Sequence, residues 1–162
     1  MTEKAWSRIM RDSAKNISIK YIIPLFVLSV FFVLSSFIGS SVKTDMDRAE
    51  KLYIKHCSHC HRKDGRGIKR VYPPLKNADY IEKASTEELL RGMIFGRSGR
   101  ITVNGITYNG VMTTEVDKSL NDKEIAMILT YVYKELNDIN ITVSAGDVKK
   151  ARKAGKLPPH GD

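Results

Sequence analysis

The chain has few residues that could cross-link a protein or fill its interior with large side chains. Its 162 residues include two cysteines and four histidines, and aromatic residues make up 8% of the total. The two cysteines stand three positions apart, so no disulfide framework competes for them. A core built from so few aromatic side chains would be thin, and a large apolar cofactor would give it a body to pack around.

Acidic residues are also scarce relative to basic ones. The chain has 18 aspartates and glutamates against 27 lysines and arginines, which gives a formal net charge of +9. This balance favours an acidic partner surface or anionic lipid. Nucleic acid is not expected as a partner, because the sequence has neither an aromatic-basic platform nor a helix-turn-helix pattern.

Charge is absent altogether from residues 21–42, which follow a basic leader at residues 1–20. As a helix this uncharged run would span about 33 Å, enough for a hydrocarbon core of about 30 Å. The basic leader predicts a single-pass anchor in the bacterial cytoplasmic membrane, with the leader in the cytoplasm and the remainder facing the periplasm or cell exterior. A signal peptide cleaved near Gly39-Ser40-Ser41 and a buried core helix remain as alternatives.

Both cysteines lie in the run Cys57-Ser58-His59-Cys60-His61. Two cysteines three positions apart, with a histidine directly after the second, form the attachment pattern of c-type haem. A helical turn would place both sulfurs on one face for thioether bonds and bring the histidine to the iron. We therefore predict one covalent haem c, held by Cys57 and Cys60, with His61 as an axial ligand.

Two other readings of this run are weaker. Zinc could use the cysteines together with a histidine at position 56, 59 or 61, but zinc sites usually draw further ligands from a distant cluster. The only other histidine is His160, near the end of the chain. A thioredoxin-like dithiol would need a βαβ setting, and none is visible in the sequence. We expect His56, His59 and His160 to be solvated surface residues.

The segment Val71–Leu75, which contains two prolines, follows the motif after a glycine-containing turn. An extended proline-rich segment offers a carbonyl that could accept the Nδ1 proton of His61. Such a bond would fix the orientation of the imidazole and raise its basicity. An ordinary rigid loop is the alternative interpretation.

An electron-transfer haem with one histidine ligand needs a second axial ligand, and a methionine thioether is the usual one. Met93 and Met127 fall inside predicted helices, where a methionine most often fills the core. Residues 96–110 read as loop, with a small hairpin around Asn104-Gly105. Met112 follows directly, and a loop can be shaped to aim sulfur at iron. We favour Met112, with Met93 or water as the alternatives.

Capping patterns predict where the later helices begin. Ser85 with Glu88 begins a helix of about ten residues, and Asn121 with Glu124 begins the longer helix that carries an apolar stripe through Leu136. The chain is thus divided into a leader at residues 1–20, an anchor at 21–42, a haem domain at 43–137 and a basic tail at 138–162. Within the tail, Ser144 and Asp147 could begin a short helix.

Taken in order, these motifs resemble a monohaem class I cytochrome c over residues 45–136. The resemblance rests on Ala49 and Tyr53, Cys57-Cys60-His61, Pro73-Pro74-Leu75, Asn109-Gly110-Val111-Met112, Leu120–Ile125 and Tyr131-Val132. It implies an all-α cytochrome c-like haem domain whose first and last helices cross, so that Ala49 and Tyr53 meet Ile128 and Tyr131. It also implies that Pro73 presents the carbonyl to His61 and that Met112 is the distal ligand. Many relatives have proline after that methionine, whereas this chain has Thr113.

The sequence therefore predicts a one-electron carrier between respiratory-chain partners rather than an enzyme, since both axial positions would be filled. Basic residues around the motif predict redox partners with an acidic docking surface: Lys55, Arg62, Lys63, Arg66, Lys69 and Arg70. The alternative is the haem c subunit of a larger membrane oxidoreductase or terminal oxidase complex. A small peroxidase or a haem sensor would need an open distal site, and ligation by Met112 counts against both.

Overall fold

A computed structural model describes residues 43–114 and 116–159. The predicted leader at 1–20, the predicted anchor at 21–42 and His160 lie outside these residues. Within the described part of the chain, none of the helices is long and apolar enough to cross a membrane.

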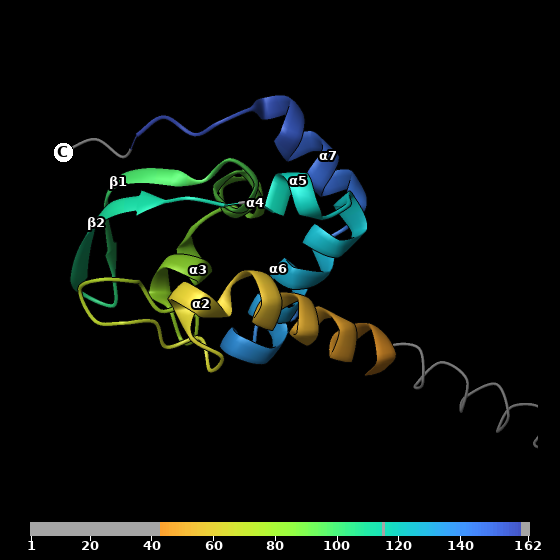
Figure 1. Ribbon diagram of the computed structural model, residues 1–162, viewed down its shortest axis with the longest axis horizontal. Coiled ribbons are helices and arrows are strands. Elements are labelled where there is room, and N and C mark those ends of the chain that lie inside the picture. The colour runs from red at the N-terminus through yellow and green to blue at the C-terminus, as the bar shows by residue number, and fades with distance from the viewer. Residues whose placement is uncertain (1–42, 115, 160–162) are drawn as a thin grey trace, which may run out of the picture. The chain divides into compact units, whose positions relative to one another are not determined.

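The described chain is mostly helical, with one two-stranded antiparallel sheet (Figure 1). It opens with helical residues 43–56. The elements that follow are α2 (Ser58–His61), α3 (Asp79–Lys83), α4 (Thr86–Phe95), β1 (Arg97–Val103), β2 (Ile106–Met112), α5 (Val116–Ser119), α6 (Asp122–Asn137) and α7 (Ala145–Ala154). The expectation of an all-α domain therefore needs correction, because the segment read as loop forms a sheet.

The first described helix and α6 meet as the resemblance implied. The rings of Tyr53 and Tyr131 lie 5.3 Å apart between centroids, and Arg48 pairs with Glu124 at 2.8 Å. Ala49 and Tyr53 are fully buried, because their side chains fill the contact between the two helices. The Tyr53 hydroxyl donates to the Arg62 carbonyl at 2.8 Å, which ties this contact to the chain just beyond the cysteine motif.

The hairpin β1–β2 is longer than the sequence predicted. Its turn is Asn104-Gly105, as expected, and both residues have positive φ, 50° and 72°. That combination is typical of the type I′ turn, whose twist matches the twist of paired strands. The strands pair from Val103↔Ile106 out to Arg97↔Met112, so Met112 ends a strand instead of lying in a loop.

Side chains from the hairpin explain why it forms. Val103 and Tyr108 are buried, and an alternating pattern of this kind stabilises a strand with one face on the core. The turn is also tied to α3: Asn104 N donates to Asp79 Oδ1 at 2.7 Å, and Asp79 N donates to Asn104 Oδ1 at 2.9 Å. The register of the strands is therefore fixed at the turn end.

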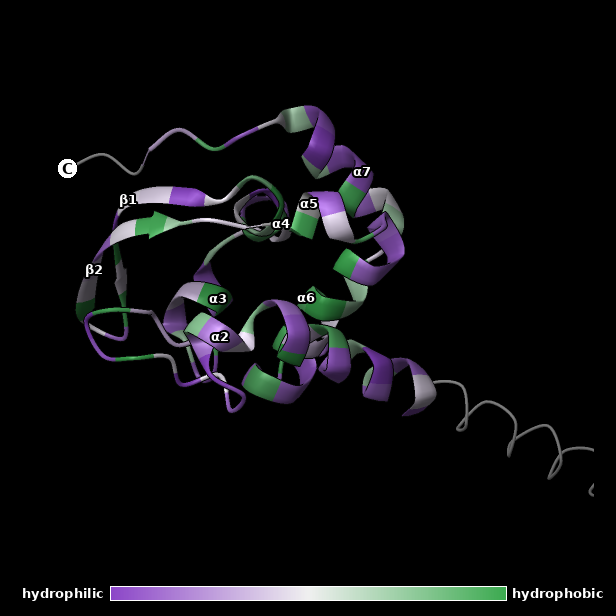
Figure 2. Cartoon of the chain, in the orientation of Figure 1, coloured by the Kyte–Doolittle hydropathy of each residue, from purple (hydrophilic) through white to green (hydrophobic). Residues whose placement is uncertain are grey.

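Residues that the sequence suggested as a tail pack on the helical domain. Helix α7 begins with the predicted capping box of Ser144 and Asp147, and it contacts both α4 and α6. Val148 and Ala151 are fully buried there, and Arg152 Nε donates to Asp122 Oδ1 at 2.7 Å. Colouring by hydropathy shows hydrophilic and hydrophobic residues interleaved along α7, as expected for a helix with one buried face (Figure 2).

Asn137, the last residue of α6, joins that helix to the proline-rich segment. Its side-chain amide donates to the carbonyls of Leu75 at 2.7 Å and Val132 at 2.8 Å, while its Oδ1 accepts from Ala78 N at 3.0 Å. The bonds to Leu75 and from Ala78 hold the loop after Pro74 against the end of α6, while the bond to Val132 stays within the helix. The segment that reaches His61 is thereby fixed at its far end.

Candidate functional site

The cysteine motif forms the short helical turn that haem attachment requires. Cys57 N donates to Tyr53 O at 2.8 Å, so the motif continues directly from the first described helix. His61 N then donates to Cys57 O at 3.0 Å, which closes a full turn across the motif. Both cysteines are free thiols and half-buried. The turn brings Cys57, Cys60 and His61 to the walls of neighbouring hollows.

The protonation state of the Cys57 thiol helps to distinguish haem attachment from sites that depend on a thiolate. Burial, with a smaller contribution from nearby Cys60, raises the pKa of the Cys57 thiol to about 12. Reactive dithiols and zinc sites depend on the thiolate, which this environment disfavours. In the described ranges, moreover, no group of three or more His, Cys, Asp or Glu side chains is placed to hold a metal ion. The raised pKa of the Cys57 thiol weighs against a redox dithiol.

His61 is 6% exposed, and its ring is held by the proline-rich segment. The Nδ1 atom lies 2.9 Å from the Pro73 carbonyl oxygen. A carbonyl can only accept, so Nδ1 carries the proton and Nε2 keeps its lone pair. Burial lowers the pKa of His61, and the bond to Pro73 raises it by less. The neutral imidazole therefore has one nitrogen fixed and the other available to a metal.

Gly67 lets the proline-rich segment come this close. Its N–H donates to the His61 carbonyl at 2.9 Å, and its φ is +63°. A Cβ at this position would lie 2.3 Å from the Tyr72 carbonyl oxygen and 2.6 Å from the Pro73 carbonyl oxygen. Both atoms belong to backbone, so no side chain could move aside to make room. Only glycine fits between His61 and the carbonyl that orients it.

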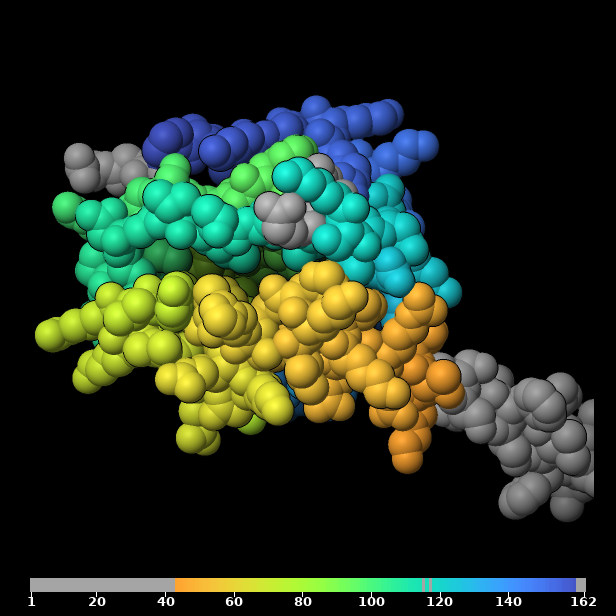
Figure 3. Space-filling model, viewed as in Figure 1, coloured from red at the N-terminus to blue at the C-terminus, as the bar shows by residue number. Residues whose placement is uncertain are grey.

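A cleft lies beside the histidine. Cavities that hold cofactors are mostly apolar. This one is walled by Pro73, Pro74 and Leu75 and by apolar residues of α3, α4 and α6: Ile81, Leu89, Ile128, Leu129 and Val132. In the space-filling view the surface is hollowed between the yellow segment around α2 and the teal hairpin (Figure 3).

Two of the three candidate methionines reach this region. Met112 lines the cleft and the two hollows that adjoin it, and His61 lines the same three spaces. Met93, on α4, lines the cleft and one of the hollows. Met127 packs against the hydrophobic core instead. The structure thus brings Met112 and Met93 to the cleft that holds the histidine, with Met112 the more exposed of the two.

The backbone of Met112 is also tightly placed. A Cβ on Gly96, whose φ is +76°, would lie 2.4 Å from the Met112 carbonyl oxygen. The end of α4 and the end of β2 are therefore in direct contact at this point. This contact fixes the strand end that carries Met112 without the proline that many relatives have at the next position.

Sequence reasoning missed Arg97 and Tyr80, which both line the cleft. Arg97 was placed in a loop, although pairing back from the Asn104-Gly105 turn would have set it opposite Met112. The Arg97 side chain is only 11% exposed. Its Nε is buried with no hydrogen-bond partner in the described chain, and the same holds for His56 Nε2.

These side chains fit a haem with covalent and axial attachment. The cleft offers an apolar lining, two thiols on one helical turn, an imidazole with a free Nε2 and a thioether. Soft sulfur and neutral imidazole are the donors typical of the iron in electron-transfer cytochromes. Arg97 Nε adds a buried donor that lacks an acceptor.

The fold and this donor set define a haem-binding domain of the cytochrome c class. A family model described as cytochrome c oxidase, cbb3-type, subunit III matches residues 44–132, and the chain belongs to that family. It is 35% identical over 117 residues to cytochrome c-552 of Thermus thermophilus, an alignment that covers 67% of this chain and 86% of that protein.

Two further relatives are named as cytochrome subunits of dehydrogenases. The chain is 29% identical over 104 residues to the cytochrome c subunit of a quinone alcohol dehydrogenase of Gluconacetobacter polyoxogenes, covering 64% of this chain and 22% of that protein. It is 28% identical over 122 residues to the fructose dehydrogenase cytochrome subunit of Gluconobacter japonicus, covering 75% and 25%. The chain is accordingly an electron-transfer protein with covalently bound haem c.

Proposed function

We propose that Cys57 and Cys60 form the two thioether links to haem c and that His61 and Met112 are the axial ligands of its iron. The observation that carries this assignment is the hydrogen bond from His61 Nδ1 to the Pro73 carbonyl, at 2.9 Å, on the wall of the cleft that Met112 also lines. When bound, haem c supplies an iron that takes up and releases one electron.

The side chains around the cleft orient the iron ligand and influence the reduction potential of the haem. Pro73 holds the imidazole in one tautomer, so Nε2 faces its target without a rotational cost. Apolar residues of α3, α4 and α6 line the cleft and would surround the haem with a low-polarity environment. A thioether donor favours the reduced state more than a second imidazole would, and a higher reduction potential follows.

The experiment that tests this function is a redox titration of the full chain, matured in a host that forms thioether links. We expect one haem per polypeptide by mass, a low-spin spectrum in both oxidation states and a reversible one-electron transition. A high-spin ferric spectrum in the wild type would instead indicate an open distal position, and a peroxidase-like activity would then have to be considered.

We further propose that the domain is held at the outer face of the bacterial cytoplasmic membrane by residues 21–42. The support is the uncharged run itself and the basic residues that precede it. Retention of the full chain in washed membranes, and its release when residues 1–42 are deleted, is the measurement; a chain that stays in the soluble fraction would contradict the proposal.

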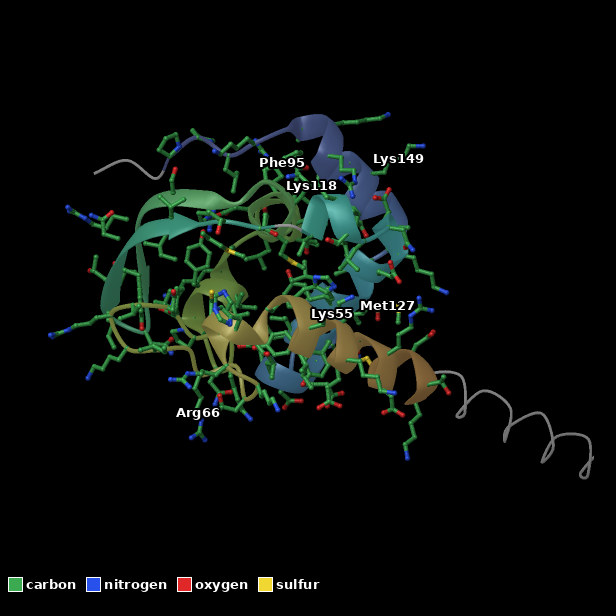
Figure 4. The ribbon with its side chains drawn as sticks, in the orientation of Figure 1. Lys55, Arg66, Phe95, Lys118, Met127 and Lys149 are labelled. Atoms are coloured by element: carbon green, nitrogen blue, oxygen red, sulfur yellow. The ribbon has the colours of Figure 1, made fainter. Side chains whose placement is uncertain are left out.

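Docking to an acidic redox partner is the second part of the proposal. Exposed basic side chains surround the motif, among them Lys55 and Arg66, and Arg66 points away from the domain (Figure 4). The rim they form is interrupted by Asp64, which pairs with Arg66 at 3.6 Å. Electrostatic steering predicts an association rate that falls as salt is raised. A rate that stays flat between low and high salt would argue against it.

A role as the haem c subunit of a larger membrane oxidoreductase is the alternative function. Two relatives, which are cytochrome subunits of an alcohol dehydrogenase and of a fructose dehydrogenase, favour it. Purification of the chain from its native membrane in mild detergent separates the two roles, because a free carrier would be recovered without stoichiometric partners.

A further inference from the structure

Arg97 is a buried cation at the edge of the cleft. One terminal nitrogen, Nη2, donates to Glu88 Oε1 at 2.7 Å, and the other, Nη1, donates to the Tyr80 hydroxyl. The guanidinium carbon also lies 5.1 Å from the centre of the Tyr80 ring. These contacts hold the planar guanidinium in place. Both hydrogen bonds use its terminal nitrogens. The remaining donor, Nε–H, is the one left buried without a partner.

An unpaired N–H of a charged group is costly inside a protein, and natural structures rarely keep one without a reason. Space lies beside it here, since Gly92 of α4 has no side chain and a Cβ there would be 3.8 Å from Nε. Both Gly92 and Arg97 line the cleft. The acceptor for Arg97 Nε–H therefore belongs to the ligand that occupies the cleft.

We propose that Arg97 Nε–H binds a carboxylate side group of haem c, with Tyr80 and Glu88 holding the guanidinium in the required plane. Haem carries two such carboxylates, and a guanidinium is the side chain best suited to a carboxylate. The inference rests on the attachment proposed at Cys57 and Cys60, which places haem in this cleft.

The hairpin joins this contact to the proposed iron ligand. Arg97 and Met112 are direct partners in the β1–β2 ladder, and residues opposite each other in antiparallel strands project to the same face. Both side chains accordingly line the cleft and the hollow beside it. The same pair of strand residues thus binds the haem at two points, a carboxylate and the iron.

The test is the midpoint potential of the haem-loaded full chain in four variants. Arg97→Gln removes a positive charge near the iron. The oxidised iron is then stabilised relative to the reduced iron, and the midpoint potential falls. We expect about a tenfold change in the reduction equilibrium, which is about 59 mV for one electron. Glu88→Gln removes a negative charge from the same cluster and shifts the potential upward. Damage to packing alone would move both variants in the same direction.

Two further variants separate charge from hydrogen bonding. Arg97→Lys keeps the charge without the Nε donor, so its potential stays near wild type while the infrared band of ¹³C-labelled haem carboxylate shifts. Arg100→Gln is the matched control, because Arg100 is an exposed arginine of the same strand; its potential changes by less than a third of the Arg97→Gln shift.

The proposal is overturned if Arg97→Gln shifts the potential no more than Arg100→Gln, or if Glu88→Gln also lowers it. An unshifted carboxylate band in Arg97→Lys would exclude the hydrogen bond as well. If Arg97→Gln does not accumulate, Glu88→Gln and Arg97→Lys still decide the question. Failure of the attachment site is distinguishable, because the wild-type chain would then lose its haem on denaturation.

Discussion

A chain with both Cys57→Ala and Cys60→Ala is expected to emerge from maturation without covalent haem. No other cysteine exists to replace them, so no thioether can form anywhere in the polypeptide. The loss is measured on a denaturing gel stained for haem-dependent peroxidase activity, where we expect the wild-type band to disappear completely. Each single variant should retain at most one link and only a small fraction of the stain.

The control for this experiment is His59→Ala. His59 lies between the cysteines on the same turn but is exposed, so its removal should leave the stain at the wild-type level. Stain that persists in the double cysteine variant would show that the haem is held elsewhere, and the attachment proposed here would be wrong.

Met112→Ala is expected to convert the haem from low-spin, six-coordinate iron to a species with water or no ligand on the distal side. An alanine cannot reach the metal. The absorption band that reports methionine-to-iron ligation should vanish from the ferric spectrum. The midpoint potential should drop as well, since the thioether is the ligand that favours the reduced iron.

Met93→Ala is the matched comparison, because Met93 also lines the cleft. If Met112 is the ligand, this variant keeps the methionine band and loses only packing. Because Met93 is partly buried, we expect a loss of stability below the roughly 2–5 kcal/mol of a fully buried methionine. Retention of the band in Met112→Ala together with its loss in Met93→Ala would transfer the ligand role to α4.

Much of the site could be predicted from motifs whose residues lie close together in the sequence. The spacing of the cysteines and His61 dictates a helical turn, and the capping pairs Asn121–Glu124 and Ser144–Asp147 both form as the sequence indicated. Each of these features depends on residues within one turn of each other. The bond from His61 to Pro73 spans twelve positions; the proline-rich segment suggested a carbonyl acceptor, and the resemblance to class I cytochromes c implied that Pro73 supplies it.

Features that depend on distant contacts were missed or misplaced. A small hairpin around Asn104-Gly105 was predicted, but its extension to Arg97 and Met112 was not, because the flanking residues 96–100 and 109–110 are rich in turn-forming residues. The role of Arg97 needed the pairing with Met112 and the positions of Tyr80 and Glu88, which come from two other elements. The docking of α7 similarly depends on surfaces of α4 and α6 that no single segment encodes.

The pairing of the hairpin also limits how the gene for such a chain can change. Because the turn at Asn104-Gly105 sets which residues face each other, one extra codon in either strand would rotate every side chain beyond it to the other face. An extra codon in β2 would in this way turn the sulfur of Met112 away from the cleft. Length variation in this part of the molecule is therefore restricted to insertions of even number or to those absorbed by a bulge.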